Sequence, residues 1–294
     1  MYWLNWFLRA AMETVQLQGE PSSPGMGDLP ESCIASILCL TTPRDVARLA
    51  CVSRIFRNAS YSDSVWQTML PTFYEDILAQ APNAPASTCS KKEIYDFLST
   101  PVLLENGTQD IWLDRATGGV CQSIGAKGLL VVWGDDQRYW SWIEQEGSRF
   151  AKVAYLIQVC WLEVRGSMQC CLPPGTYTLS WRLSFSLGTK NFQGFNYKPV
   201  KFSFEGPDHV PVDFEKVLTT NEIFREGGLP PLWTRGGDKK WVELGVGEFT
   251  VERGDSPFDI KFSMMQIEGG FWKSGLLLDS VLIRPTRPSE HQRN

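Results

Sequence analysis

The stretch Tyr177-Thr178-Leu179-Ser180-Trp181-Arg182-Leu183-Ser184-Phe185 alternates large apolar residues with smaller or polar ones. A period of two places successive side chains on opposite faces, which is typical of a β-strand with one buried face and one wet face. Similar alternation recurs at residues 200–205 and 258–264, and Val153–Val164 is almost continuously apolar, which predicts one strand covered on both faces. Because Gly and Pro interrupt these runs, the region from about Ile111 onward is predicted to be an antiparallel β-sandwich.

A different periodicity marks residues 29–74, where apolar residues recur at spacings of three and four, as on one face of a helix. A short helix is expected directly after the Leu-Pro pair that opens this region. A second begins at Thr42-Pro43-Arg44-Asp45, because Thr42 can cap a helix and Pro43 fits its first turn. The apolar spacing predicts that this helix continues to about Phe56, and Ser62–Trp66 opens a third. The region is therefore predicted to be a small all-α domain.

The composition divides the chain into five expected segments. The segment before the helices is rich in Pro, Ser and Gly, which is typical of a flexible leader. Between the helices and the sandwich, Ser90-Lys91-Lys92-Glu93 is a capping box that predicts one helix. The expected segments are a leader at 1–27, a helical domain at 28–75, a spacer with one helix at 76–108, the sandwich at 109–286 and a tail at 287–294.

Composition also limits the function. The chain has 294 residues and a net charge of −5, which argues against nucleic acid as a partner, because phosphate binding needs a basic field. Its eight Cys include no C-x-x-C pair and it has only two His, so neither a metal site nor a cofactor is expected. The apolar run Met1–Met12 is too short to span a bilayer, and no membrane role is expected.

The chain also lacks the common catalytic motifs. It contains no G-x-S-x-G elbow, no P-loop and no complete G-x-G-x-x-G. We therefore expect no catalytic residues and no enzyme activity. Reduced thiols, the default for a chain that does not need disulfides, predict a cytoplasmic or nuclear protein.

The stretch Trp133–Trp142 holds three of the twelve Trp and one of the eight Tyr around the polar turn Gly134-Asp135-Asp136-Gln137. The residues on both sides of this turn have the apolar pattern of β-strands, so the turn is expected to join two strands. Aromatic rings beside a polar loop suit a sugar, because a ring face packs against C–H groups while polar residues bind hydroxyls. A Trp-rich core with an ordinary hairpin is the alternative.

Together with Trp161-Leu162-Glu163-Val164 and Trp272-Lys273-Ser274-Gly275, this stretch resembles the phloem protein 2 or Nictaba-like plant lectins over roughly Gln109–Pro285. The resemblance implies that Trp133 and Trp140 stack on a sugar of the N-acetylglucosamine type.

It further implies that Asp259 and Gln266 receive the hydroxyls of that sugar. Gln266 stands where the family carries an acid, and Asp259 and Gln266 are seven residues apart, so in one regular strand they face opposite ways. The other Trp of the alternating and apolar runs are expected in the core; these are Trp142, Trp161, Trp181 and Trp272.

The helical region resembles an F-box, in the order Leu29-Pro30-Glu31, Pro43-Arg44-Asp45, Leu49–Arg54 and Trp66. That family docks a Skp-type adaptor, which joins it to a cullin-based ubiquitin ligase. An ordinary three-helix subdomain of the sandwich is the alternative. The resemblance implies that the adaptor is contacted by Leu29, Pro30, Ile34, Leu38, Val46, Leu49 and Val52.

The two resemblances together predict a substrate-receptor subunit of a ubiquitin ligase, whose sandwich holds a glycan or glycoprotein target. One alternative is a sandwich that binds a protein surface and carries a vestigial sugar site. Another is a free cytosolic lectin, which leaves the helical region unexplained.

Overall fold

The computed structural model describes residues 29–104, 107–185, 192–218, 241–254 and 256–286. The chain divides into two compact units. The first comprises Met1–Leu70, Ala86–Asp96 and Arg115–Gly118, and the second comprises Pro71–Pro85, Phe97–Asp114 and Gly119–Asn294. The expected leader at 1–27 and tail at 287–294 lie outside the described residues.

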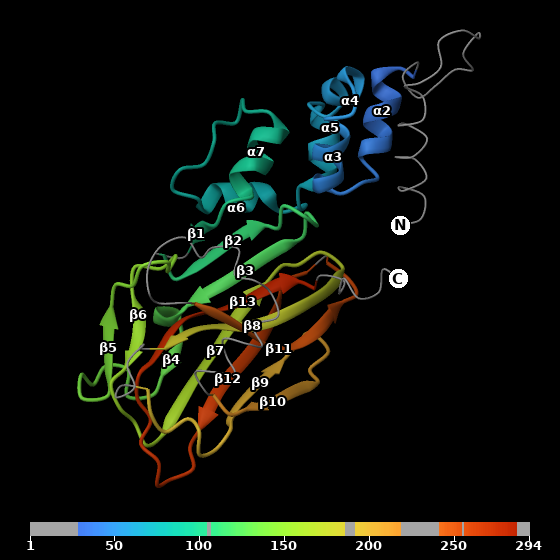
Figure 1. Ribbon diagram of the computed structural model, residues 1–294. Coiled ribbons are helices and arrows are strands. Elements are labelled where there is room, and N and C mark those ends of the chain that lie inside the picture. Colours follow the sequence, from blue (N-terminus) through green and yellow to red (C-terminus); the bar gives the residue numbers. More distant parts are fainter. Residues whose placement is uncertain (1–28, 105–106, 186–191, 219–240, 255, 287–294) are drawn as a thin grey trace. The chain divides into compact units, whose positions relative to one another are not determined.

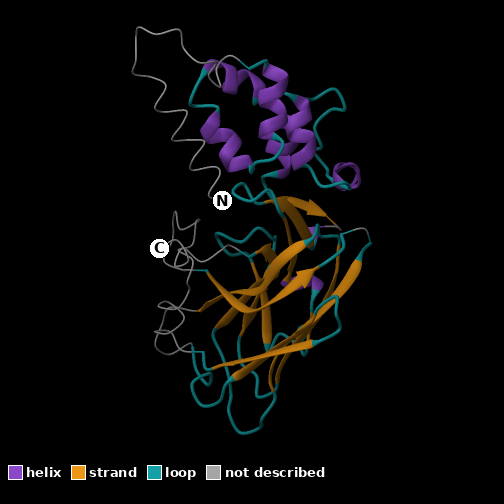
Figure 2. Ribbon diagram, turned by 90° about the vertical axis from the view of Figure 1, so that its right-hand side faces the viewer, coloured by secondary structure: helices purple, strands orange, loops and turns teal. Residues whose placement is uncertain are grey.

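The first unit is built from short helices around a small core (Figures 1 and 2). The Trp66 side chain is buried in this core, where its Nε1–H donates to the Ser60 carbonyl (2.6 Å) and its ring lies 4.9 Å from that of Tyr95. An all-α unit was predicted here, and it is present. Its helices are α2 (Glu31–Leu38), α3 (Pro43–Leu49), α4 (Arg54–Ala59) and α5 (Asp63–Met69).

The expected helix from Thr42 to about Phe56 is two helices. Its start is as predicted, since the Asp45 amide donates to the Thr42 hydroxyl (3.2 Å). The α3 helix ends at Leu49, because Ser53 takes an extended conformation and its hydroxyl accepts from the Phe56 amide (3.4 Å), which starts α4. The prediction of one continuous helix is therefore wrong, because the apolar spacing continues past Ser53, which caps the start of a second helix.

Removing the α3 cap should weaken the helical unit. Thr42→Ala leaves the Asp45 amide without its side-chain acceptor, and we expect a loss of about 1 kcal/mol in the free energy of unfolding, measured by urea titration of the helical circular dichroism signal. Ser62→Ala is the matched control, because Ser62 precedes α5 but its side chain caps no amide. Equal effects of the two substitutions would show that capping is not the cause.

The segment predicted as a spacer with one helix contains α7 and most of α6, which begins two residues before that segment. The α7 helix (Lys91–Leu98) begins with the predicted capping box, in which the Ser90 amide donates to Glu93 Oε2 (2.8 Å) and the Glu93 amide donates to Ser90 Oγ (3.3 Å). The α6 helix (Tyr74–Gln80) was not predicted. Glu75 and Asp76 lie in its first turn, where acidic side chains favour a helix start.

The second unit is the predicted antiparallel β-sandwich (Figures 1 and 2). Its first sheet has the order β1-β2-β3-β13-β6-β5, with β8 paired to both β13 and β11, and its second has the order β10-β9-β12-β7-β4. The 3₁₀ helix η3 (Ala126–Gly128) follows β3. The strands are β1 (Val102–Leu104), β2 (Gln109–Leu113), β3 (Val120–Gly125), β4 (Leu130–Val131), β5 (Trp140–Ile143), β6 (Val153–Leu156), β7 (Leu162–Cys170), β8 (Gly175–Phe185), β9 (Val200–Glu205), β10 (Pro211–Lys216), β11 (Val242–Val251), β12 (Phe258–Gln266) and β13 (Leu276–Pro285).

The two sheets meet around Trp181 of β8, which is fully buried. Its ring lies 5.9 Å from that of Phe202 on β9 and 5.9 Å, edge-on, from that of Phe262 on β12. Tilted and edge-on ring pairs are the preferred aromatic geometries, so these contacts stabilise the layer between the sheets. The core prediction is therefore confirmed for Trp181.

The structure corrects two strand predictions and confirms a third. Val153–Val164 is not one strand but β6 in the first sheet and β7 in the second. The polar turn after Trp133 joins two strands, as predicted; because β4 and β5 belong to different sheets, the turn is a crossover, and the alternative of an ordinary hairpin is wrong. Arg182 and Ser184, expected on a wet face, are both buried.

Candidate functional site

Among the residues of the sandwich that the structure describes, three tryptophans are exposed, Trp133 at 56%, Trp161 at 47% and Trp272 at 56%. Trp133 follows β4, Trp161 precedes β7, and Trp272 lies in the loop between β12 and β13. Large exposed aromatic side chains mark interaction surfaces when they are close together. We call these three residues the tryptophan platform.

Backbone pairing brings the three loops to one end of the sandwich. The segment Ile157–Trp161 lies between the other two loops. On one side, the amides of Ile157 and Gln158 donate to the carbonyl of Tyr139 (2.9 and 3.3 Å). On the other side, Val159 and Lys273 exchange two backbone hydrogen bonds (2.9 and 2.8 Å). The Val132 amide also donates to the Glu163 carbonyl (3.0 Å), which carries the pairing of β4 with β7 up to Trp133.

The buried side chain of Lys273 connects two of the loops at this end of the sandwich. It is fully buried, and its Nζ donates to the carbonyls of Cys160 (2.6 Å) and Gln266 (2.9 Å). Burial lowers the pKa of Lys273, because an ammonium loses solvation there. The residue before it, Trp272, and the residue after Cys160, Trp161, are therefore carried on loops that one side chain cross-links.

Charged side chains near the tryptophan platform form ion pairs. Glu163 accepts from Trp161 Nε1 (2.7 Å) and from Arg165 Nε (2.5 Å), and these hydrogen bonds lower the pKa of its carboxyl, the one from Trp161 most. In the β4–β5 loop, hydrogen bonds from Arg138 lower the pKa of Asp136 to about 2. Both carboxylates are thus ionised at neutral pH and already paired with an arginine.

The turn that carries Trp133 is conformationally unusual. Trp133 has a φ of 64°, in the left-handed region that non-glycine residues rarely adopt. A Cβ on the next residue, Gly134, would lie 2.8 Å from the Val131 carbonyl, so the turn requires glycine there. The Trp133 ring lies 5.9 Å from the ring of Tyr139, which supports it from one side. Strained backbone of this kind is found preferentially at binding sites.

The structure does not bring the four predicted sugar-binding residues together. Only Trp133 presents its ring to solvent, because Trp140 is 1% exposed and donates its Nε1–H to the Val132 carbonyl (3.1 Å). Gln266 is 4% exposed, and its amide donates to the Lys198 carbonyl (2.6 Å). Asp259 is exposed, but it lies at the other end of β12, about 23 Å from Gln266 at roughly 3.3 Å per residue.

The prediction of direct ligand contact is therefore corrected for Trp140 and Gln266, which are packed into the sandwich. The core prediction is likewise wrong for Trp161 and Trp272, while Trp142 is half-buried. One signal pointed to Trp272, since Gly269-Gly270 before it and Gly275 after it predict a loop. For Trp161 no local signal distinguishes exposure from burial, because its neighbours Cys160 and Leu162 are apolar.

Some of the predicted adaptor-binding residues are exposed and others are buried. Leu29, Pro30 and Val52 are exposed and Leu49 is half-buried. Ile34, Leu38 and Val46, by contrast, are buried in the core of the helical unit, so the prediction that they contact an adaptor is corrected. Leu40 and Tyr61 are further exposed apolar side chains of this unit that the sequence reasoning did not select.

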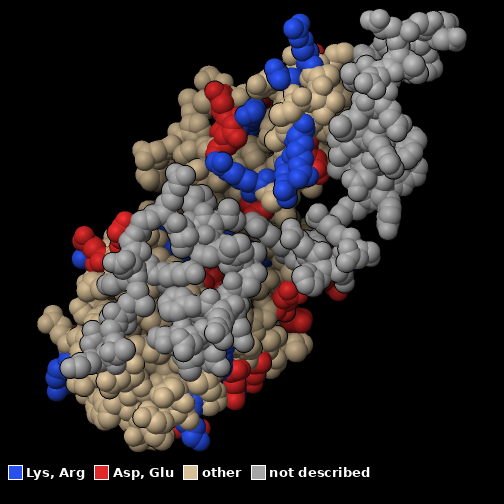
Figure 3. Space-filling model, in the orientation of Figure 1, with Lys and Arg blue, Asp and Glu red and all other residues tan. Residues whose placement is uncertain are grey.

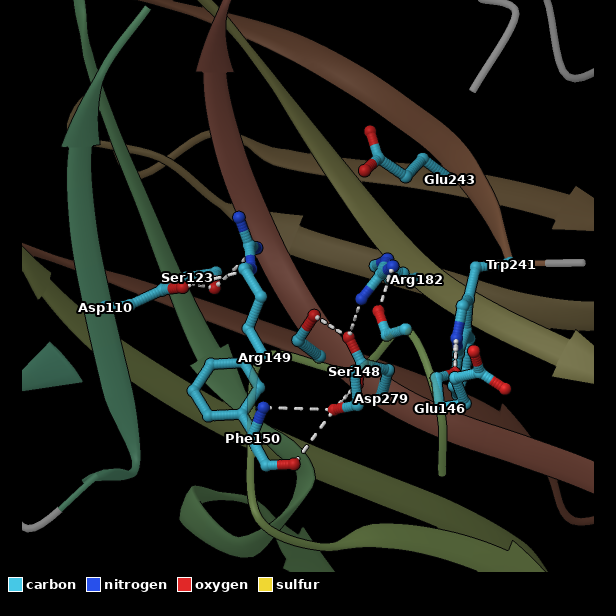
Figure 4. Close-up of polar contacts among 12 residues, drawn as sticks. Asp110, Ser123, Glu146, Ser148, Arg149, Phe150, Arg182, Trp241, Glu243 and Asp279 are labelled. Carbon is cyan, nitrogen blue, oxygen red and sulfur yellow. Dashed lines mark hydrogen bonds and ion pairs between the residues drawn. The ribbon is translucent and has the colours of Figure 1, made fainter. Parts of the chain in front are cut away.

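A cluster of buried charged side chains lies around Arg182 of β8 and Asp279 of β13 (Figure 4). Arg182 Nη1 donates to Asp279 Oδ2 (2.7 Å), and Arg149 Nε lies 3.1 Å from Asp110 Oδ2. Ser148 donates to Asp279, and Ser123 donates to Asp110. Burial raises the pKa of the Asp110 carboxyl, although Arg149 opposes this shift.

The contacts of this cluster indicate a structural role. It holds the loop between β5 and β6 against the sheet, since Arg182 Nη2 donates to the Gly147 carbonyl (2.8 Å) and Trp241 Nε1 donates to the Glu146 carbonyl (3.0 Å) (Figure 4). Its carboxylates are each engaged by an arginine. Within the described ranges, no group of three or more His, Cys, Asp or Glu side chains could hold a metal ion.

The described surface carries both signs of charge. Figure 3 shows acidic and basic side chains scattered over the visible part of the sandwich, rather than gathered in one field. Among the helices that the structure describes, none is long and apolar enough to cross a membrane.

The helical unit and the sandwich define the class of the protein, an F-box protein with a lectin-like domain. Residues 26–72 match the model of the F-box-like family, and residues 119–285 match the model of phloem protein 2. The chain belongs to the phloem protein 2 family, in its group of F-box proteins, and the resemblance predicted from the sequence is confirmed. Neither matching model describes an enzyme family.

Two relatives from Arabidopsis thaliana illustrate the match. The F-box protein PP2-A15 is 38% identical, over 94% of this chain and 93% of its own length. The F-box protein PP2-A12 is 36% identical, over 90% of this chain and 88% of its own length. Among solved structures, a family 35 carbohydrate-binding module from Clostridium thermocellum aligns with 56% of this chain and 98% of its own, at 12% identity and a TM-score of 0.31, which is too remote to identify a ligand.

Proposed function

We infer that this chain is a substrate-receptor subunit of a Skp–cullin ubiquitin ligase, in the cytoplasm or nucleus. The helical unit binds the adaptor, and the sandwich holds a target through a glycan. The observation that carries this proposal is the presence, in one chain, of an F-box unit and a lectin-like sandwich with three exposed tryptophans at one end.

The surface of the helical unit supports the adaptor role. Leu29 and Pro30 are exposed directly before α2, where their side chains are available to a partner. Leu40 is 89% exposed at the end of the same helix, and Val52 and Tyr61 are exposed as well. A unit this small has little core of its own, and burying these apolar side chains against an adaptor would stabilise it.

A sandwich that binds a protein surface is the second candidate. It is favoured by the burial of Trp140 and Gln266, which removes two of the residues expected to hold a sugar. Exposed Ile157 and Ile267 beside the platform also suit an apolar protein contact. The three tryptophans and their paired polar neighbours favour the glycan, because rings with a polar border match a sugar better than aliphatic side chains do.

Adaptor binding is tested by co-purification of the full chain with a Skp-type adaptor. We expect the double substitution Leu29→Ala, Pro30→Ala to weaken binding by at least about thirtyfold, since truncating central interface residues costs ~2 kcal/mol or more. The α2 helix should persist, because the amides of Cys33 and Ile34 donate to the backbone carbonyl of Pro30, which the substitution retains.

Leu103→Ala is the matched control, since Leu103 is as exposed as Leu29 but belongs to the second unit. It should bind the adaptor as the unchanged chain does. Full adaptor binding after deletion of residues 1–75 would refute the proposal.

A further inference from the structure

We propose that one end of the sandwich docks on a phospholipid surface, into which a patch of exposed apolar side chains inserts. This apolar loop patch consists of Trp133, Ile157, Trp161, Tyr197, Ile267 and Trp272. The inference goes beyond the proposed function, because a lipid surface is neither the adaptor nor a glycan. It also departs from the expectation of no membrane role, which considered only a segment that spans a bilayer.

Strand register in the second sheet brings these side chains to one end. The last residue of β12, Gln266, pairs with the first residue of β7, Leu162. The next residues in register are Ile267 and Trp161, which therefore lie side by side. Because β9 begins and β4 ends at the same end of this sheet, the loops before β9 and after β4 join them. The patch is thus the rim of one sheet, continued by the β12–β13 loop, which projects beyond its strands (Figure 1).

The types of side chain in the patch suit the interface of a bilayer. Trp and Tyr collect where hydrocarbon meets the headgroups, because their rings are apolar while their N–H or O–H stays hydrated. Tyr197 is 63% exposed, and its ring stacks on that of Phe271 at 5.0 Å. Ile157 and Ile267 are exposed at the same end and carry no polar atom in their side chains. An exposed apolar patch of this kind marks a membrane or protein contact.

The charges at the border of the patch favour phospholipid over an apolar protein surface. The Arg138 side chain is 77% exposed, whereas that of its partner Asp136 is 28% exposed. Arg165 is likewise 57% exposed, against 13% for Glu163, and a third ion pair at this end has both partners exposed. Since a guanidinium has five N–H groups, Arg138 and Arg165 can donate to lipid phosphates while they keep their carboxylates. Cations around an apolar surface are typical of proteins that lie on anionic lipid.

The loops that carry the patch are already held in place. Lys273 cross-links the segment before Trp161 to the end of β12 through the carbonyls of Cys160 and Gln266. The Gln266 side chain in turn donates to the Lys198 carbonyl (2.6 Å), which fixes the loop before β9. Insertion into lipid therefore orders few protein groups, which favours binding.

The test is co-sedimentation of the full chain with vesicles of phosphatidylcholine and phosphatidylserine, which carry no sugar. We expect the unchanged chain to sediment with the vesicles, and brominated lipid to quench part of its tryptophan fluorescence. Ile267→Asp and Trp272→Ala should each weaken vesicle binding at least about tenfold, because each removes an apolar side chain that the lipid buries.

Val210→Asp is the matched control. Val210 is 56% exposed and lies between β9 and β10, at the opposite end of the second sheet, so the same kind of substitution there should leave vesicle binding unchanged. Near-ultraviolet circular dichroism should show that all three variants are folded, because each replaced side chain is exposed.

The proposal is overturned if the unchanged chain stays in the supernatant, or if Ile267→Asp and Trp272→Ala sediment as well as the unchanged chain does. It is also overturned if Val210→Asp loses binding to the same extent. A chain that stays off vesicles but dimerises through the patch, as sedimentation velocity would show, identifies a second copy as the occupant instead. Adaptor binding, measured on the same preparations, separates each of these failures from a failure of the ligase-subunit proposal.

Discussion

Replacing Asp279 by Ala should lower the free energy of unfolding of the sandwich by about 3–5 kcal/mol, the largest effect that we expect from a single polar substitution. The Asp279 carboxylate is fully buried and accepts hydrogen bonds from Arg182 (2.7 Å), Ser280 (3.0 Å) and Ser148. Without it, the contacts of the buried Arg182 guanidinium that remain among the described residues are a hydrogen bond to the Gly147 carbonyl and a ring contact with Trp241 at 5.0 Å.

The measurement is urea unfolding of the full chain, followed by the β-sheet circular dichroism signal. Glu243→Ala is the matched control on the same sheet. Glu243 pairs with Arg284 at 2.8 Å, but both side chains are more than a quarter exposed, so the loss should stay below about 1 kcal/mol. If the two variants lose equally little, the buried cluster does not hold the β5–β6 loop in place.

Trp140→Ala should be the second strongly destabilising change, again by about 3–5 kcal/mol, because removing a large buried aromatic side chain leaves a cavity. Trp140 is among the largest fully buried side chains, and its indole N–H is bonded to the Val132 carbonyl. The substitution also leaves that carbonyl without its donor, which adds to the loss.

Trp133→Ala is the matched control, since it removes the same side chain seven positions earlier in the same stretch. Its ring is more than half exposed, so stability should change by no more than about 0.5 kcal/mol. A folded, fully stable Trp140→Ala protein that has lost sugar binding would instead restore Trp140 as a ligand contact.

Much of the fold could be predicted because it depends on local pattern. The alternation of Tyr177–Phe185 predicts β8 correctly, and the Thr42 cap and the Ser90–Glu93 capping box predict two helix starts that the structure contains. These signals act within a few residues, where periodicity and hydrogen-bonding capacity are properties of the chain itself. The family resemblance, which depends on the order of the motifs, was equally accessible.

The candidate site could be predicted only in part. Trp133 was identified because it borders a polar turn, and its exposure follows from that turn. Trp140 ends the same turn, but it enters β5, whose pairing with β6 places its ring inside the sandwich. The residues close to Trp140 in the sequence do not indicate which strand β5 pairs with. The burial of Trp140 could therefore not be predicted from the sequence.

The amino-acid sequence by itself thus determined that a helical region precedes a β-sandwich, where α3 and α7 begin, that β8, β9 and β12 are strands, and to which family the chain belongs. The tertiary structure decided that β4 and β5 separate into different sheets, that Lys273 is buried as a cross-link, and that Trp161 and Trp272 are exposed beside Trp133. The physical reason is the range of the interactions. Secondary structure follows from neighbours in the chain, whereas burial follows from strand pairing between residues more than a hundred positions apart, as between Val159 and Lys273.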